Sequence, residues 1–347
     1  MNRYVFAVCA IVCNVAMAQS SVTVYGVADA GIVAESGGPA GSVTKMVGGV
    51  EGGSRLGFRG TEDLGRGVAA IFALEMGINL DTGTSAQGGV LFGRQAFVGL
   101  SSPAGALTLG RQYTPLFLSL SAVDPFQAFS TAGSAANLMS NAGIRMNNTI
   151  KYASAPVNGF NGELAYGLGE VPGSSRVGRQ LGAALGYVRG PLSLRLGYAN
   201  VNSIPVGPAP MTTGKTTMLG GVYDFRVVKL SLGVASNKGT VNVNTRIDPN
   251  PAAKSRDTIL GVTLPVGAGN IRASAVFKHD RSPTDRNARQ LGAAYNYFIS
   301  KRTDVYIAYA RIHNDVLAGA TGFYTVGNAT EAGSGNKAFN LGMRHSF

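Results

Sequence analysis

Apolar and polar residues alternate along most of the chain, in segments of about ten residues. At 191–198, PLSLRLGY places Leu194 and Leu196 on one face and Arg195 on the other. Successive side chains of a strand point to opposite faces, so this period of two predicts β-strands and an all-β fold. The same alternation recurs at 227–235, 271–278, 290–297 and 337–347.

The connections between these segments are short and long in turn. Tight turns are expected near 65–67, 103–105, 190–191, 267–269 and 300–302, and longer polar connections include 37–53, 81–91 and 115–147. An even number of strands, with short turns at one end and long loops at the other, is typical of a transmembrane β-barrel. The pattern predicts about 16 strands, near 21–35, 54–64, 68–80, 92–102, 107–114, 148–155, 163–170, 179–189, 192–200, 215–226, 227–236, 257–265, 270–280, 289–299, 303–312 and 337–347.

The two faces of the expected strands suit lipid outside and water inside. The apolar faces carry Leu, Val, Ile and Phe, with Tyr toward the strand ends, whereas the opposite faces carry Arg, Lys, Ser, Asn and Gly. A soluble β-sandwich would have to bury those arginines or expose many apolar stripes. Because every backbone amide inside a membrane must be hydrogen-bonded, we expect an antiparallel sheet that closes on itself.

The stretch SRLGFRG at 54–60 shows what this orientation means for single residues. Leu56 and Phe58 share the face expected to meet lipid, and Arg55 faces water. The faces are mixed in two later segments, where Arg94 and Arg111 share their parity with apolar residues. Mixed faces would suit a wall that packs against another subunit or an inserted loop.

The first residues, MNRYVFAVCAIVCNVAMAQS, predict a secretory signal peptide. They combine Arg3, an apolar run and a small-residue motif that ends at Ala18, so residues 1–18 are the expected signal. Residues 19–347 then form a single barrel domain. Both cysteines, Cys9 and Cys13, lie inside the signal, which excludes a disulfide framework and cysteine-based sites from the mature chain.

Composition and motifs argue against nucleic-acid binding and catalysis. The chain has 347 residues and a net charge of +12, but its basic residues are scattered singly instead of forming a cluster or a helical stripe. The histidines (His279, His313 and His345) are isolated, and no G-x-S-x-G motif is present. The adjacent Glu62 and Asp63 face opposite ways near a turn. We therefore expect no enzyme activity, no metal site and no cofactor.

Five stretches of the chain form recognisable blocks: SVTVYGVADAGIV (21–33), SRLGFRGTEDLGRGVAAIFALE (54–75), RQAFVGLSSPAGALTLGRQYTP (94–115), SKRTDVYIAY (300–309) and GMRHSF (342–347). They resemble the general Gram-negative trimeric porins. The resemblance covers both ends of the chain and most strands between them, in matching order. It implies a 16-stranded barrel in the cell outer membrane, a homotrimer, and a water-filled channel for passive diffusion of small hydrophilic solutes. The third long loop, 115–147, would fold into the lumen and narrow it.

A closer resemblance is to the anion-selective members, whose constriction carries a small cluster of arginines. Carried over by motif, it implies that Arg55, Arg94 and Arg145 form the constriction. Outer-membrane lipids and lipopolysaccharide would surround such a barrel, and small anionic solutes would pass through it. The further pore-lining candidates are Arg59, Arg111, Lys151, Glu75 and Asp124.

The charges of the long loop favour an anion preference. Between positions 112 and 150 the only charged residues are Asp124 and Arg145. A cation-preferring constriction would need loop carboxylates facing the arginines, and only Asp124 is available. Arginines without carboxylate partners in a low-dielectric lumen concentrate anions and repel cations. The alternative is that each arginine is a solvated wall residue, paired with Glu62, Asp63 or Glu75.

Two further features leave alternatives open. The last strand ends in Phe347, with Met343 and Leu341 on the same face, which resembles the signal that barrel-assembly machinery recognises; it could equally be a closing strand that only meets lipid. A substrate-specific channel for a sugar or an organic anion would use aromatic residues such as Tyr113. A structural anchor or adhesin is disfavoured because most long loops are only moderate.

Overall fold

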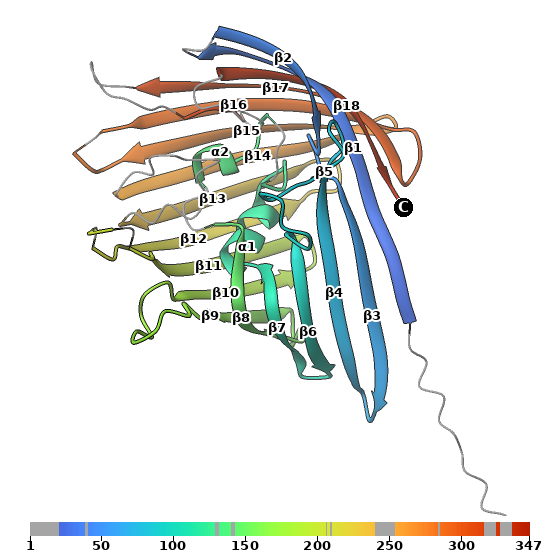
Figure 1. Ribbon diagram of the computed structural model, residues 1–347. Coiled ribbons are helices and arrows are strands. Elements are labelled where there is room, and N and C mark those ends of the chain that lie inside the picture. Colours follow the sequence, from blue (N-terminus) through green and yellow to red (C-terminus); the bar gives the residue numbers. More distant parts are fainter. Residues whose placement is uncertain are drawn as a thin grey trace, which may run out of the picture.

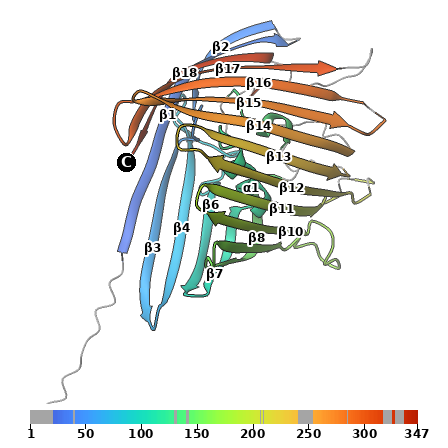
Figure 2. The same cartoon turned by 180° about the vertical axis from the view of Figure 1, so that it is seen from behind.

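The computed structural model describes residues 21–38, 41–128, 132–139, 143–205, 207–208, 210–239, 254–283, 285–315, 324–326 and 335–347. The expected signal peptide lies outside these residues. The described part contains an antiparallel sheet of 18 strands, of which 16 close into a barrel and two are additional. Figure 1 and Figure 2 show the ring of strands from opposite sides.

The barrel strands follow one another around the ring in chain order. They are β1 (Ser21–Gly38), β3 (Arg55–Gly65), β4 (Val68–Asn79), β6 (Gln95–Ser102), β7 (Gly105–Tyr113), β8 (Arg145–Ser154), β9 (Phe160–Gly167), β10 (Gln180–Arg189), β11 (Leu192–Asn202), β12 (Thr213–Asp224), β13 (Lys229–Lys238), β14 (Lys254–Val266), β15 (Gly269–Asp280), β16 (Asn287–Phe298), β17 (Thr303–Asp315) and β18 (Gly335–Ser346). Closure comes from β1, which pairs with β3 on one side and with β18 on the other. The expected closed antiparallel barrel is therefore confirmed.

The two additional strands correct the expected loops at 37–53 and 81–91. β2 (Gly41–Gly48) pairs with the part of β1 that extends beyond β3, and β5 (Thr84–Ser85) makes a short pair with the end of β4. β1 is 18 residues long, whereas its pairing with β3 ends at Val27. The exposed edge of β1 would leave backbone groups without partners, and β2 supplies them.

The outward faces carry the apolar residues that the alternation assigned to lipid. Leu194 and Leu196 are exposed, whereas Lys278 and Gln290 are buried on the inner face of their strands. Phe58 pairs directly with the exposed Val24, so both lie on the outer face. Phe58 itself is half-buried.

The connection between β7 and β8 lies against the inner wall. Its first helix, α1 (Pro115–Val123), begins at Thr114, whose Oγ1 accepts a hydrogen bond from the N–H of Phe117 at 3.1 Å. α1 lies against β9 to β13. Gly220 of β12 allows this close approach, because a Cβ there would lie 2.8 Å from a methyl group of Val123. Figure 1 and Figure 2 both show α1 enclosed by the strands.

Hydrogen bonds fix the second half of this connection to the barrel. α2 (Ala136–Met139) is a single short helix near β15. Lys278 of β15 donates from Nζ to the carbonyl of Leu138 at 2.7 Å and forms an ion pair with Asp257 at 3.1 Å. Gln290 of β16 donates to the carbonyl of Gly133 at 2.9 Å. These inward side chains hold residues 132–139 inside the ring.

Candidate functional site

Two of the expected constriction arginines meet at one carboxylate on the inner wall. Arg94 lies just before β6, and its Nε is 2.7 Å from Oε1 of Glu75 on β4. Arg55, the first residue of β3, approaches Oε2 of the same carboxylate at 3.7 Å. Tyr25 of β1 donates its hydroxyl to that oxygen at 3.0 Å. Glu75 therefore stands between Arg55, the first residue of β3, and Arg94, which lies just before β6.

Tyr113 connects the third arginine to this group. Arg94 donates from Nη2 to the Tyr113 hydroxyl at 2.7 Å, and Arg145 donates to the same oxygen at 3.3 Å. The Arg145 guanidinium also lies 4.8 Å from the centre of the Tyr113 ring, a favourable cation–π position. Tyr113 stacks on Phe117 of α1 with ring centres 5.3 Å apart. The structure thus brings Arg55, Arg94 and Arg145 together at the base of the loop.

We call Arg55, Arg94 and Arg145, with Glu75 and Tyr113, the arginine cluster. Its charges are not balanced pair by pair. Within the described residues Arg145 makes no ion pair, and its Nε is buried without a hydrogen-bond partner. Arg55 reaches Glu75 only at 3.7 Å, on a carboxylate already bonded to Arg94. The alternative in which a nearby acid neutralises each arginine therefore holds for Arg94, which pairs with Glu75. It does not hold for Arg145, which has no carboxylate partner among the described residues.

The other basic candidates are bound to neighbours in the wall. Lys151 of β8 pairs with Glu163 of β9 at 2.6 Å. Arg59 is exposed, and its guanidinium lies 5.3 Å from the centre of the Tyr25 ring. Arg111 donates from Nε to the carbonyl of Gly93 at 2.7 Å and also contacts Asn147.

Local irregularities explain why the parity of Arg94 and Arg111 misleads. The pairing of β7 with β8 shifts register between Gly110 and Gln112, and Gly110 has a φ of +132°, which a side chain would strain. Arg111 sits in this bulge. Arg94 precedes the first residue of β6 and lies in a bend, so strand alternation does not set its direction.

Asp124 occupies a different place from the pore-lining position expected for it. Its side chain is only 3% exposed and accepts hydrogen bonds from the backbone N–H groups of Phe126, Ala128 and Ala135, at 2.8 to 3.0 Å. The carboxylate closes the turn that follows α1. It is therefore bound within the loop instead of facing the arginines.

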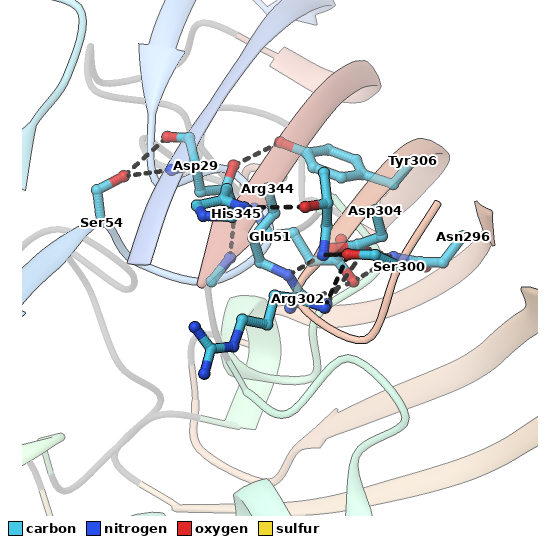
Figure 3. A network of polar contacts seen from close by, with 12 residues as sticks. Asp29, Glu51, Ser54, Asn296, Ser300, Arg302, Asp304, Tyr306, Arg344 and His345 are labelled. Atoms are coloured by element: carbon cyan, nitrogen blue, oxygen red, sulfur yellow. Dashed lines mark hydrogen bonds and ion pairs between the residues drawn. The ribbon is translucent and has the colours of Figure 1, made fainter. Parts of the chain in front are cut away.

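A second polar group, which sequence reasoning missed, adjoins the arginine cluster. Glu51 lies in the connection between β2 and β3, and its carboxylate accepts two hydrogen bonds from Asn296 and pairs with Arg272. Arg344 is held by Asp304 at 2.9 Å and lies 3.9 Å from Glu51. Figure 3 shows this arrangement around Arg344. The feature of the sequence that could have indicated this group is a single acid between glycines, Glu51 in VGGVEGGS.

Asp29 completes this group, which we call the Glu51 network (Asp29, Glu51, Arg272, Asn296, Asp304, Tyr306 and Arg344). Asp29 accepts from the Tyr306 hydroxyl at 2.6 Å and from the backbone N–H of Glu51 at 2.9 Å. In Figure 3 the side chains of Asp29 (β1), Asn296 (β16), Asp304 and Tyr306 (β17) and Arg344 (β18) converge around Glu51. The glycines beside Glu51 form the boundary between the two regions: a Cβ on Gly53 would lie 2.7 Å from Arg94, and one on Gly52 would lie 3.4 Å from Arg344.

Comparison with known proteins assigns the family. Residues 5–317 match the Gram-negative porin family. The chain belongs to this family. The porin is 33% identical to outer membrane porin protein 32 of Delftia acidovorans, over 96% of this chain and 95% of the relative. It is 31% identical to an outer membrane porin protein of Bordetella pertussis, over 96% of each chain.

Solved porin structures share the fold. An anion-selective porin from Comamonas acidovorans superposes on this porin with a TM-score of 0.79, at 30% identity, covering 95% of this chain and all of that one. OmpT of Vibrio cholerae in its trimer form gives a TM-score of 0.68 at 15% identity, over 94% and 99% of the two chains. The second likeness concerns the fold alone.

The family assignment settles the broad function. The porin is a channel protein of the outer membrane, a multi-pass β-barrel and not an enzyme, as the sequence predicts. No helix in the described ranges is long and apolar enough to cross a membrane. Nor do the described side chains bring together three or more His, Cys, Asp or Glu groups that could hold a metal ion.

Proposed function

We propose that this porin is a general diffusion channel with a moderate preference for small anions, and that Arg55, Arg94 and Arg145 form its constriction. The observation that carries the proposal is the charge balance of the arginine cluster, in which Arg145 has no ion pair among the described residues and Arg55 shares Glu75 with Arg94. Guanidinium groups stay ionised at any relevant pH and offer several fixed donors to anions. The anion-selective Comamonas relative supports the same assignment.

The inward loop strengthens the effect of these charges. α1 and α2 lie against the inner wall, so the water-filled cross-section is narrowed beside the cluster. A low-dielectric wall focuses the field of a few charges into the remaining passage. The one acid of this loop in the described residues, Asp124, is bound to backbone donors and does not offset the arginines.

The test is the reversal potential of single channels in a KCl gradient across a planar bilayer. The proposal expects the sign of a channel more permeable to Cl⁻ than to K⁺, and a smaller potential for Arg55→Ser. A reversal potential with the sign of a cation-selective channel would overturn the proposal. Saturable block of the conductance by a sugar would instead favour a substrate-specific channel.

The porin is further proposed to assemble as a homotrimer among outer-membrane lipids and lipopolysaccharide. The resemblance to trimeric porins supports this. Size-exclusion chromatography with light scattering should give three times the monomer mass for the refolded protein in detergent. A monomer mass at all protein concentrations would refute the assembly.

Phe347, Met343 and Leu341 are proposed as the signal read by the barrel-assembly machinery. All three are exposed on the outer face of the last strand or its end. Phe347→Ser should lower the amount of folded porin in the outer membrane, because the terminal aromatic group is lost. Val234→Ser, at another exposed lipid-facing position, is the matched control. Equal losses in both variants would mean that Phe347 only meets lipid.

A further inference from the structure

Five basic side chains gather at the long-loop end of β10 to β14. They line an open groove of about 560 Å³, together with Asn200, Asn202, Thr213 and Gly239. Among the described residues, no acidic side chain lines the groove. The five are Arg176, Arg179, Lys215, Lys238 and Lys254.

The three lysines of this group point away from the channel. Side chains an even number of residues apart share a face of a strand. Lys215 lies four residues from Leu219, Lys238 four from Val234 and Lys254 six from Leu260. These three apolar residues are 46% to 54% exposed on the outer face, and the pairings of β12, β13 and β14 contain no register shift.

The inner face of the same strands is different. Asn237 of β13 donates to Ser255 at 2.8 Å and to Asp257 at 2.7 Å, and it accepts from Thr216 at 2.8 Å. Polar groups that point inward thus satisfy one another. The outward lysines therefore form a surface separate from the channel wall.

The lysines repel one another across the strands. Lys238 stands directly opposite Lys215 in one pairing and directly opposite Lys254 in the other. Like charges at directly opposite positions destabilise a sheet. No ion pair involves any of the five basic residues within the described part of the chain. At the short-turn end of the same strands, by contrast, Lys229 pairs with Asp224 at 3.1 Å.

The position along the strand identifies what meets these charges. On β13, Leu230, Leu232 and Val234 are successive exposed residues of the outer face, followed by Ser236 and then Lys238. Four residues span about 13 Å of strand. Lys238 therefore lies just beyond the apolar surface, on the side of the long loops, which is the extracellular side of such barrels. Lipid headgroups occupy this level.

We propose that Arg176, Arg179, Lys215, Lys238 and Lys254 bind the phosphate groups of an anionic lipid headgroup in the outer leaflet. The acyl chains of that lipid lie along the exposed Leu219, Val234 and Leu260 below the groove. An amphiphile satisfies both surfaces at once, whereas a free phosphate ion satisfies only the charges. A bound phosphate also neutralises the lysine charges and so removes the repulsion between the lysines that stand directly opposite one another.

The proposal rests on the proposed contact with outer-membrane lipid and not on the anion preference of the channel. The test is binding of deep-rough lipopolysaccharide to the refolded porin in neutral detergent, measured by native mass spectrometry. Two other ligands are titrated in parallel: the same lipid after enzymatic removal of its phosphates, and inorganic phosphate alone. The variant is Lys215→Gln/Lys238→Gln/Lys254→Gln. The control, Arg189→Gln/Lys301→Gln/Arg302→Gln, removes three exposed charges at the short-turn end.

The triple lysine variant should bind the lipid about a hundredfold more weakly, since each basic residue at an anionic membrane surface contributes about fivefold. The control should stay within about twofold of the wild type, and the dephosphorylated lipid should bind as weakly as in the lysine variant. Equal lipid binding by wild type and lysine variant would overturn the proposal. So would inorganic phosphate that binds as tightly as the lipid. Single-channel conductance of the lysine variant is measured separately from lipid binding. It shows whether the variant is folded and whether it retains the proposed channel function.

Discussion

The arginine cluster and the Glu51 network lie side by side on the inner wall, yet they treat their charges differently. In the network, Arg272 and Arg344 are held by Glu51 and Asp304, with amide and hydroxyl groups between them. In the cluster, Glu75 serves two arginines and Arg145 has no ion pair among the described residues. The effect of an arginine in a channel wall on ion selectivity therefore depends on whether a carboxylate pairs with it.

The largest effect is expected from breaking the balance of the Glu51 network. Glu51→Gln leaves the buried Arg272 guanidinium without its carboxylate, which should lower the free energy of unfolding by about 3 kcal/mol. Unfolding of the refolded porin in guanidinium chloride measures the change in the free energy of unfolding. Lys229→Gln, which removes an exposed ion pair, is the control and should leave the midpoint unchanged. An unchanged midpoint for Glu51→Gln would mean that the network is not a structural unit.

The second-largest effect is expected from the connection between β7 and β8, which contains Asp124. Asp124→Asn removes the charge that three backbone N–H groups share, at a cost of about 2 kcal/mol to the local fold. The open channel should show larger current fluctuations, while its permeability ratio changes little because Asp124 does not face the arginines. The exposed Asp63→Asn is the comparison variant. A large change of ion selectivity with a quiet current would contradict the placement of Asp124.

The two regions also show how far a sequence can predict this molecule. The limits of the barrel strands follow from alternation, since a strand with lipid on one side and water on the other must alternate. β2 escapes this reasoning because its short, glycine-flanked segment pairs only with the free end of β1. The direction of Arg111 depends on a bulge that the pattern does not mark. The contact between Glu51 and Asn296 joins residues 245 positions apart, so nothing local predicts it.

Removing the one carboxylate of the arginine cluster should make the cluster differ even more from the balanced Glu51 network. Glu75→Gln should raise the Cl⁻/K⁺ permeability ratio by about threefold, because one negative charge disappears from a focused field. Reversal potentials of the variant and the wild type in the same KCl gradient measure it. A lower ratio would show that Glu75 chiefly positions the arginines and does not offset them.

The smallest effect is expected at Arg59. This side chain is exposed and lies over the ring of Tyr25, so salt screens its charge. Arg59→Ser should change the permeability ratio by less than about twofold at 0.1 M salt. If this variant shifted the ratio as much as Arg55→Ser, the wall charge as a whole would set selectivity.

The most direct test removes the two arginines that lack a carboxylate of their own. In Arg55→Ser/Arg145→Ser, Glu75 and Arg94 remain as a matched pair, so the cluster resembles the Glu51 network. The Cl⁻/K⁺ permeability ratio, measured from the reversal potential, should fall by about tenfold toward no selectivity. Arg189→Ser/Arg302→Ser, at the short-turn end, should leave it unchanged. A double variant that keeps the wild-type ratio would contradict the conclusion that the unbalanced arginines select anions.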